Sequence, residues 1–172
     1  MTVKINLLPE YAESIKNNKV TLVKNFSKIE NKYDFNLLIS IFERIDTPIV
    51  FIGPEDSFFK KIFCIRNVES TFKDFKFFKS FLQQVFKYLP DNRDGCDIFF
   101  SFKSTAGLSH VDIEDVFIVG LEGVITYKTF GEKTNYYEIH KGDLIYIPKG
   151  VQHKVIGMSP RITLSVGFFG NK

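Results

Sequence analysis

The chain has 172 residues, 44% hydrophobic and 25% charged, a composition that favours one globular domain and argues against disorder. No apolar run approaches the roughly 20 residues of a membrane helix, and the N-terminus lacks a secretory signal pattern. The net charge of +3 does not demand a nucleic-acid partner, and two cysteines do not suggest a disulfide framework, so we expect a cytoplasmic protein.

Residues 1–95 mix predicted helices with short strands. The strongest helix pattern covers Ser70–Leu89, where apolar residues, mostly Phe, recur at three- and four-residue steps. Lysines line much of the other side, and we interpret them as a solvated face rather than a nucleic-acid or membrane surface. Further helices are predicted at Pro9–Asn18 and Tyr33–Ile45, and strands at Val20–Val23, Pro48–Gly53 and Ile62–Arg66.

Residues 96–172 change to a pattern of short strands and turns. Seven segments rich in β-branched and aromatic residues are separated by glycines and by Ser159-Pro160. This predicts a mainly β fold, a barrel or jelly roll, with the helices of the N-terminal half packed outside and the whole chain, 1–172, as a single domain. The predicted strands are Asp97–Phe102, Asp115–Glu122, Val124–Phe130, Tyr136–His140, Asp143–Pro148, Val151–Met158 and Arg161–Phe168.

Two of the three histidines lie in settings that favour metal binding. His110 and Asp112 are two residues apart, so on a strand both side chains point to the same face, and His153 follows later in the predicted barrel. Two imidazoles and one carboxylate that leave three coordination positions open form the facial triad of non-haem Fe(II) oxygenases. The alternative interpretation is that the His-x-Asp pair is polar surface and that His153 is a satisfied barrel histidine.

The segment around His153 resembles the second motif of the cupin superfamily. Gly142, Pro148, Gly150 and His153 stand at the motif's intervals, although Gly157 replaces its usual final Asn. The first motif is matched less closely, because Asp112 stands where simple cupins have a second His and Val116 or Phe117 where they have a Glu ligand. The resemblance implies a double-stranded β-helix.

The substituted pattern is similar to the JmjC and cupin-like branch of the Fe(II)- and 2-oxoglutarate-dependent oxygenases. In that branch, a stretch like Asp115–Gly123 follows His-x-Asp. The resemblance covers about residues 97–168 and, more weakly, Lys19–Phe26. It implies that His110, Asp112 and His153 are the iron ligands, and that oxidative decarboxylation of 2-oxoglutarate is coupled to oxidation of a C–H bond.

One departure concerns the distal carboxylate of 2-oxoglutarate, which members of the branch often bind with a Lys where this chain has Ile125. Arg161, helped by Thr163, is the expected substitute, because both alternate with apolar residues and would face the barrel interior. Lys128 has the opposite parity and would serve only if a bulge turned it inward. Tyr127 shares the interior parity and would donate a hydrogen bond. The alternative interpretation is that Arg161 is a solvent-exposed strand residue.

The sequence therefore predicts a 2-oxoglutarate-dependent hydroxylase or related oxidase that binds Fe(II). Two alternatives stay open: a cupin metalloenzyme that does not use 2-oxoglutarate, such as a small-molecule dioxygenase or isomerase, and a non-catalytic ligand-binding cupin. A chain of 172 residues leaves little room for a recognition domain, so we expect a small-molecule or peptide substrate and no membrane or nucleic-acid partner. By family analogy, a homodimer is also expected.

Overall fold

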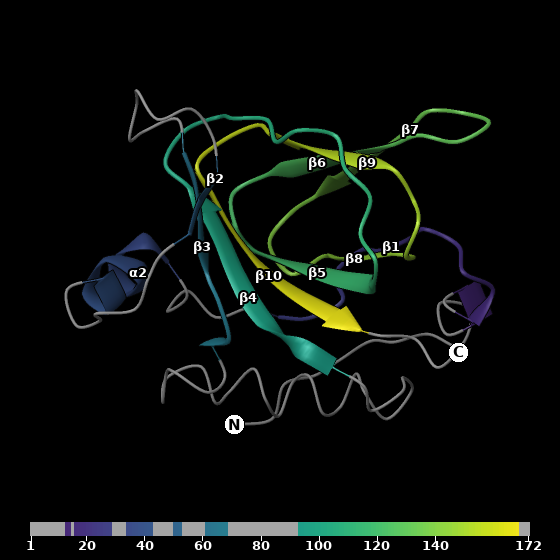
Figure 1. Cartoon of the computed structure of the whole chain (residues 1–172). Helices are drawn as coiled ribbons and strands as arrows, with labels where there is room; N and C mark the ends of the chain where they lie inside the picture. The colour runs from purple at the N-terminus through teal and green to yellow at the C-terminus, as the bar shows by residue number, and fades with distance from the viewer. Residues whose placement is uncertain are drawn as a thin grey trace.

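The computed structural model describes residues 13–14, 16–28, 34–42, 50–52, 61–68 and 93–168. Its strands form two antiparallel sheets that face each other across the interior of a barrel (Figure 1). The strands are β1 (Thr21–Val23), β2 (Val50–Ile52), β3 (Ile62–Ile65), β4 (Arg93–Ser101), β5 (Asp115–Glu122), β6 (Ile125–Thr129), β7 (Asn135–Ile139), β8 (Leu144–Ile147), β9 (His153–Gly157) and β10 (Arg161–Phe168).

The large sheet has the order β1-β8-β5-β10-β4-β3-β2, and the small sheet has the order β7-β6-β9. Strands far apart in sequence are neighbours, as in a jelly roll, because β10 pairs with both β4 and β5 and β8 pairs with β1 and β5. The prediction of a mainly β jelly-roll fold is confirmed. The bounds of β5 and β10 agree with the predicted strands.

The segment from Thr105 to His110 extends the small sheet without being a regular strand. Two isolated bridges tie it to β9, one between Ala106 and Ile156 and one between His110 and His153. Gly107 N also donates to Val155 O at 2.9 Å. The prediction that His110 and Asp112 point to the same face assumed strand geometry, although neither residue lies in a predicted strand. Instead, Asp112 lies in the loop that leads into β5, and the bridge to β9 positions His110.

Alternation along the strands separates the barrel interior from an outer apolar layer. On the interior side, a buried cluster combines residues of β5, β6, β7 and β8, among them Val116, Ile125 and Ile145. On the other face of the large sheet, the Phe117 ring packs against Tyr146 with centroids 4.8 Å apart. Burial of each such side chain contributes about 1.5–3 kcal/mol of transfer free energy, so both layers oppose a one-residue slip of register.

Two of the predicted helices are described in part. Helix α2 (Phe35–Phe42) lies beside β2 and β3 (Figure 1), and the rings of Phe35 and Phe102 are 5.6 Å apart. Ser70–Leu89 lies outside the described residues. Half of Pro9–Asn18 is described, and Glu13, Ser14 and Lys16 are helical there, with Asn17 N donating to Glu13 O at 2.9 Å. The expectation that several helices cover the barrel is therefore unsupported, and the single-domain organisation stays a prediction. No helix within the described ranges is long and apolar enough to cross a membrane.

Candidate metal centre

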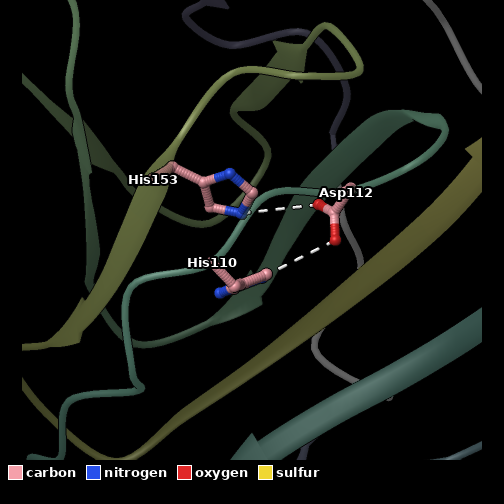
Figure 2. A group of neighbouring side chains, drawn as sticks. All are labelled: His110, Asp112 and His153. Atoms are coloured by element: carbon pink, nitrogen blue, oxygen red, sulfur yellow. Dashed lines mark ion pairs between the residues drawn. The ribbon is translucent and has the colours of Figure 1, made fainter.

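The structure brings the three predicted ligand residues together at one end of the barrel (Figure 2). His110, Asp112 and His153 each offer one ligand atom, and these atoms all lie within 4.8 Å of one another. The Nε2 atoms of His110 and His153 lie 3.7 and 3.5 Å from the two carboxylate oxygens of Asp112. Residues from a loop and from the first position of β9 thus point at a common centre.

Main-chain hydrogen bonds hold the two imidazoles in place. His110 N donates to His153 O and His153 N donates to His110 O, both at 2.9 Å. Each ring also has its Nδ1 near a carbonyl oxygen two residues earlier, 3.1 Å from Leu108 O and 3.0 Å from Val151 O. Because a carbonyl only accepts, Nδ1 carries the proton in the neutral ring, and Nε2 keeps its lone pair toward the centre. This is the arrangement that metal-binding histidines need.

Burial and exposure differ within the cluster. His153 is 2% exposed, and burial lowers the pKa of its imidazole, although the Asp112 charge opposes the shift. The ring is therefore neutral near pH 7 and able to bind a metal. The side chains of His110 and Asp112 are 48% and 31% exposed, so the centre is open to solvent on that side. Two imidazoles and a carboxylate suit Fe(II) with three positions left for other ligands.

A cavity of about 600 Å³ extends from this cluster between the two sheets. Its volume lies within the roughly 300–1,000 Å³ of small-molecule sites. Val116, Ile118, Ile125 and Val155 form part of its apolar wall, so Val116 faces inward as its parity predicts. Apart from the cluster, polar groups along the wall include Asp97, Glu114, Tyr127, Arg161, Thr163 and Ser165.

Arg161 and Thr163 lie in this cavity, as the alternation of β10 predicts. Both are 3% exposed, so Arg161 is not a solvent-exposed strand residue. Its Nη1 donates to Thr105 O at 3.4 Å, and among the described residues it has no carboxylate within ion-pair distance. Burial lowers the pKa of the guanidinium, which is the sign of a costly, uncompensated charge.

The two other predicted cosubstrate residues have different positions. Tyr127 lines the cavity, with its ring centroid 6.0 Å from that of His153, and burial raises the pKa of its hydroxyl. Lys128 lies outside the cavity, where its Nζ is 4.9 Å from the centroid of the Phe130 ring. Strand β6 pairs in regular register with β7 and β9, so the structure does not support a bulge that turns Lys128 inward.

Sequence reasoning missed Glu114. Glu114 lines the cavity two residues after Asp112, and Gly167 leaves room for it, because a Cβ there would lie 2.4 Å from the Glu114 carboxylate. The alternation through His110 and Asp112 was the available signal.

Comparisons with known proteins agree with this fold. A JmjC domain family model matches residues 124–172. The ribosomal oxygenase YcfD of Escherichia coli superposes with a TM-score of 0.79 at 18% identity, over 100% of this chain and 54% of that one. YcfD in complex with cobalt and 2-oxoglutarate gives 0.78 at 18% identity, over 99% and 54%. An oxidoreductase of the 2OG-Fe(II) oxygenase family from Burkholderia pseudomallei gives 0.63 at 13% identity, over 96% and 92%.

The chain thus spans about half the length of YcfD, and no curated protein matches it in sequence. Identities of 18% and 13% show a common fold and leave the activity to be argued from the residues. The resemblance to the JmjC and cupin-like oxygenases is confirmed by a family match over the C-terminal strands and by a shared fold over the whole chain.

Proposed function

We propose that this protein is an Fe(II)- and 2-oxoglutarate-dependent oxygenase that oxidises a C–H bond of a small molecule or peptide. The observation that carries the proposal is the presence of two complementary features in one cavity: the His110, Asp112 and His153 cluster, and the buried Arg161. The first suits a divalent metal, and the second suits a carboxylate. The cobalt and 2-oxoglutarate complex of YcfD, a protein of the same fold, adds support.

The cluster would hold the iron through the two Nε2 atoms and one oxygen of Asp112. A bound iron supplies the redox chemistry with O₂. The protein orients the rings through the carbonyls of Leu108 and Val151, so that the metal meets preformed lone pairs. The cavity beside the cluster would accept the keto acid end of 2-oxoglutarate.

The opposite wall would bind the distal carboxylate. Arg161 offers a planar two-pronged donor, which pairs with a carboxylate more strongly than a point charge does. Tyr127 and Thr163 line the same cavity and would each donate a hydroxyl hydrogen bond. Ile125, which pairs with Gly157 beside the guanidinium, and Val155 also line the cavity and would limit the access of water to this ion pair, which would strengthen it.

The substrate would approach from the solvent side of the cluster. Leu108 lines the cavity and is 86% exposed, and Ile113 next to Asp112 is 83% exposed. An apolar rim of this kind suits a peptide segment or the apolar part of a small molecule. The name of YcfD as a ribosomal oxygenase supports a protein or peptide substrate. A homodimer and a cytoplasmic location stay predictions.

An anaerobic Fe(II) titration with and without 2-oxoglutarate tests the proposal. We expect about one iron per chain and a weak visible charge-transfer band that develops only when 2-oxoglutarate is present. Asp112→Ala serves as the control that should lose the band. Iron binding without a band in the wild type would instead favour a cupin metalloenzyme that does not use 2-oxoglutarate. No iron binding would favour a ligand-binding cupin.

A further inference from the structure

Gly157, the last residue of β9, leaves the space in which the guanidinium of Arg161 lies. An ideal Cβ at Gly157 would be 1.4 Å from Arg161 Nη1 and 2.3 Å from Arg161 Cζ. The glycines with positive φ are Gly123, Gly142 and Gly150, so the backbone at Gly157 would admit any L residue. Glycine is needed here for room and not for conformation.

This space belongs to the barrel interior. In the β6–β9 register, Ile125 pairs with Gly157 and Tyr127 pairs with Val155. Directly paired residues share a face of the sheet, and Ile125, Tyr127 and Val155 all line the cavity. The Cβ positions of residues 125 and 157 are therefore about 4.5–5.5 Å apart on the interior face.

The carbonyl of Thr105 bounds the same space from the neighbouring segment. It accepts from Gly157 N at 2.7 Å and from Arg161 Nη1 at 3.4 Å. A Cβ at Gly157 would lie 2.9 Å from this oxygen, so the backbone leaves little room on that side. A side chain at residue 157 would collide most severely with the guanidinium, which is the flexible end of a long side chain, and would also require a small shift of the Thr105 carbonyl.

We propose that Gly157 is a positioning residue that holds the Arg161 guanidinium where the distal carboxylate of 2-oxoglutarate binds. The inference rests on the proposed function, because it needs a carboxylate in the cavity. It has a second consequence. Ile125 lies directly across from Gly157, so a cation introduced at residue 125 would reach the same carboxylate from β6 and replace Arg161.

Calorimetric binding of two keto acids to the Mn(II)-loaded full chain tests the role of Gly157. The probes are 2-oxoglutarate and 2-oxobutyrate, which lacks the distal carboxylate. Gly157→Ala should weaken 2-oxoglutarate by about tenfold, the effect of losing a charge-assisted contact, and should leave 2-oxobutyrate and Mn(II) stoichiometry unchanged. Gly131→Ala is the matched control, because a Cβ there meets only Lys133 O at 3.9 Å.

The second experiment moves the cation to the opposite strand. Arg161→Ala should lower the affinity for 2-oxoglutarate to that for 2-oxobutyrate. Adding Ile125→Lys to this variant should restore much of the difference, whereas adding Ile125→Met, which changes the shape of the side chain without adding a charge, should restore none. Thermal unfolding of each variant verifies that the barrel is intact.

The outcomes separate this inference from the proposed function. Equal wild-type affinities for both keto acids would overturn the proposed function, since no distal carboxylate would be bound. If the wild type binds 2-oxoglutarate more tightly than 2-oxobutyrate and Gly157→Ala keeps this full difference, only the positioning role of Gly157 is overturned. Loss of both keto acids and of Mn(II) in Gly157→Ala would also overturn it, because the glycine would then support the fold. If Ile125→Lys does not restore the 2-oxoglutarate affinity of the Arg161→Ala variant, then residues 125 and 161 do not face the same carboxylate.

Discussion

The two ends of the cavity are built in different ways. At the metal end, main-chain hydrogen bonds fix His110 against His153, and carbonyl oxygens orient both rings. At the other end, the Arg161 guanidinium is held mainly by the space that Gly157 leaves and by one long hydrogen bond to Thr105. A metal needs several lone pairs at set distances, whereas a carboxylate needs one well-placed cation. Substitution of a ligand residue at the metal end should therefore abolish metal binding, whereas at the arginine end the cation could be moved to another residue with 2-oxoglutarate still bound.

The largest effect is expected at the metal end. Asp112→Ala should remove most bound iron and with it the activity, because two imidazoles alone leave an incomplete, uncompensated ligand set. Iron per chain, measured after desalting, tests this. Glu138→Ala is a suitable control, since Glu138 is an exposed carboxylate paired with His140 and distant in sequence from the cluster. Full iron stoichiometry in a His110→Ala, Asp112→Ala double variant would show that the metal lies elsewhere.

A smaller effect is expected at the arginine end. Arg161→Ala should raise the KM for 2-oxoglutarate by about tenfold or more, because a hydrogen bond to a charged group contributes roughly 1.5–3 kcal/mol. Iron binding should change little, since Arg161 reaches the cavity from β10 and is not part of the metal cluster. Steady-state kinetics with varied 2-oxoglutarate, together with iron stoichiometry, distinguish loss of the anchor from loss of the fold. An unchanged KM would remove Arg161 from the site.

The same contrast explains what could be predicted from the sequence. Strand parity was enough to place Arg161 and Thr163 inside the barrel and Lys128 outside it, because side chains alternate strictly along β6 and β10. Motif spacing was enough to bring His153 toward His110 and Asp112. Both signals are local periodicities that the burial of apolar faces enforces.

What could not be predicted depends on pairings between distant segments. The isolated bridge between His110 and His153 has no strand periodicity of its own, so the sequence pattern could not predict that β9 positions His110. The sequence shows that Gly157 stands where the motif usually has Asn. The role of this glycine could not be predicted, because it depends on the β6–β9 register and on the position of the Arg161 side chain. Glu114 was missed because its place on the cavity wall depends on the space that Gly167 leaves on β10, far away in the sequence.

An intermediate effect concerns protonation at the metal end. Metal binding needs neutral imidazoles, so affinity is retained above the histidine pKa values and lost as the pH falls through them. Burial lowers the pKa of His153, so its contribution should persist to a lower pH than that of an ordinary imidazole. Between about pH 7.5 and pH 6, we expect protonation of His153 to lower the Mn(II) affinity by less than the roughly fourfold that an imidazole with a pKa of about 6.5 gives. Affinity that stays flat down to about pH 5 would argue against histidine ligation.

The smallest effect is expected for Lys128, the basic residue next in sequence to Tyr127. Its ammonium group lies over the rings of Phe130 and Tyr136, 4.9 and 5.6 Å from their centroids, on the face of β6 turned away from the cavity. Lys128→Ala should therefore leave the KM for 2-oxoglutarate within about twofold and cost only the roughly 0.5–1 kcal/mol of an exposed cation–π contact, seen by urea unfolding. Lys128 and Arg161 are both cations near Tyr127, but only Arg161 faces the cavity. The variant therefore also tests whether a cation must face the cavity to bind the distal carboxylate of 2-oxoglutarate. A large rise in KM with Lys128→Ala, and none with Arg161→Ala, would mean that β6 carries a bulge in solution and that the cation comes from β6 instead of β10.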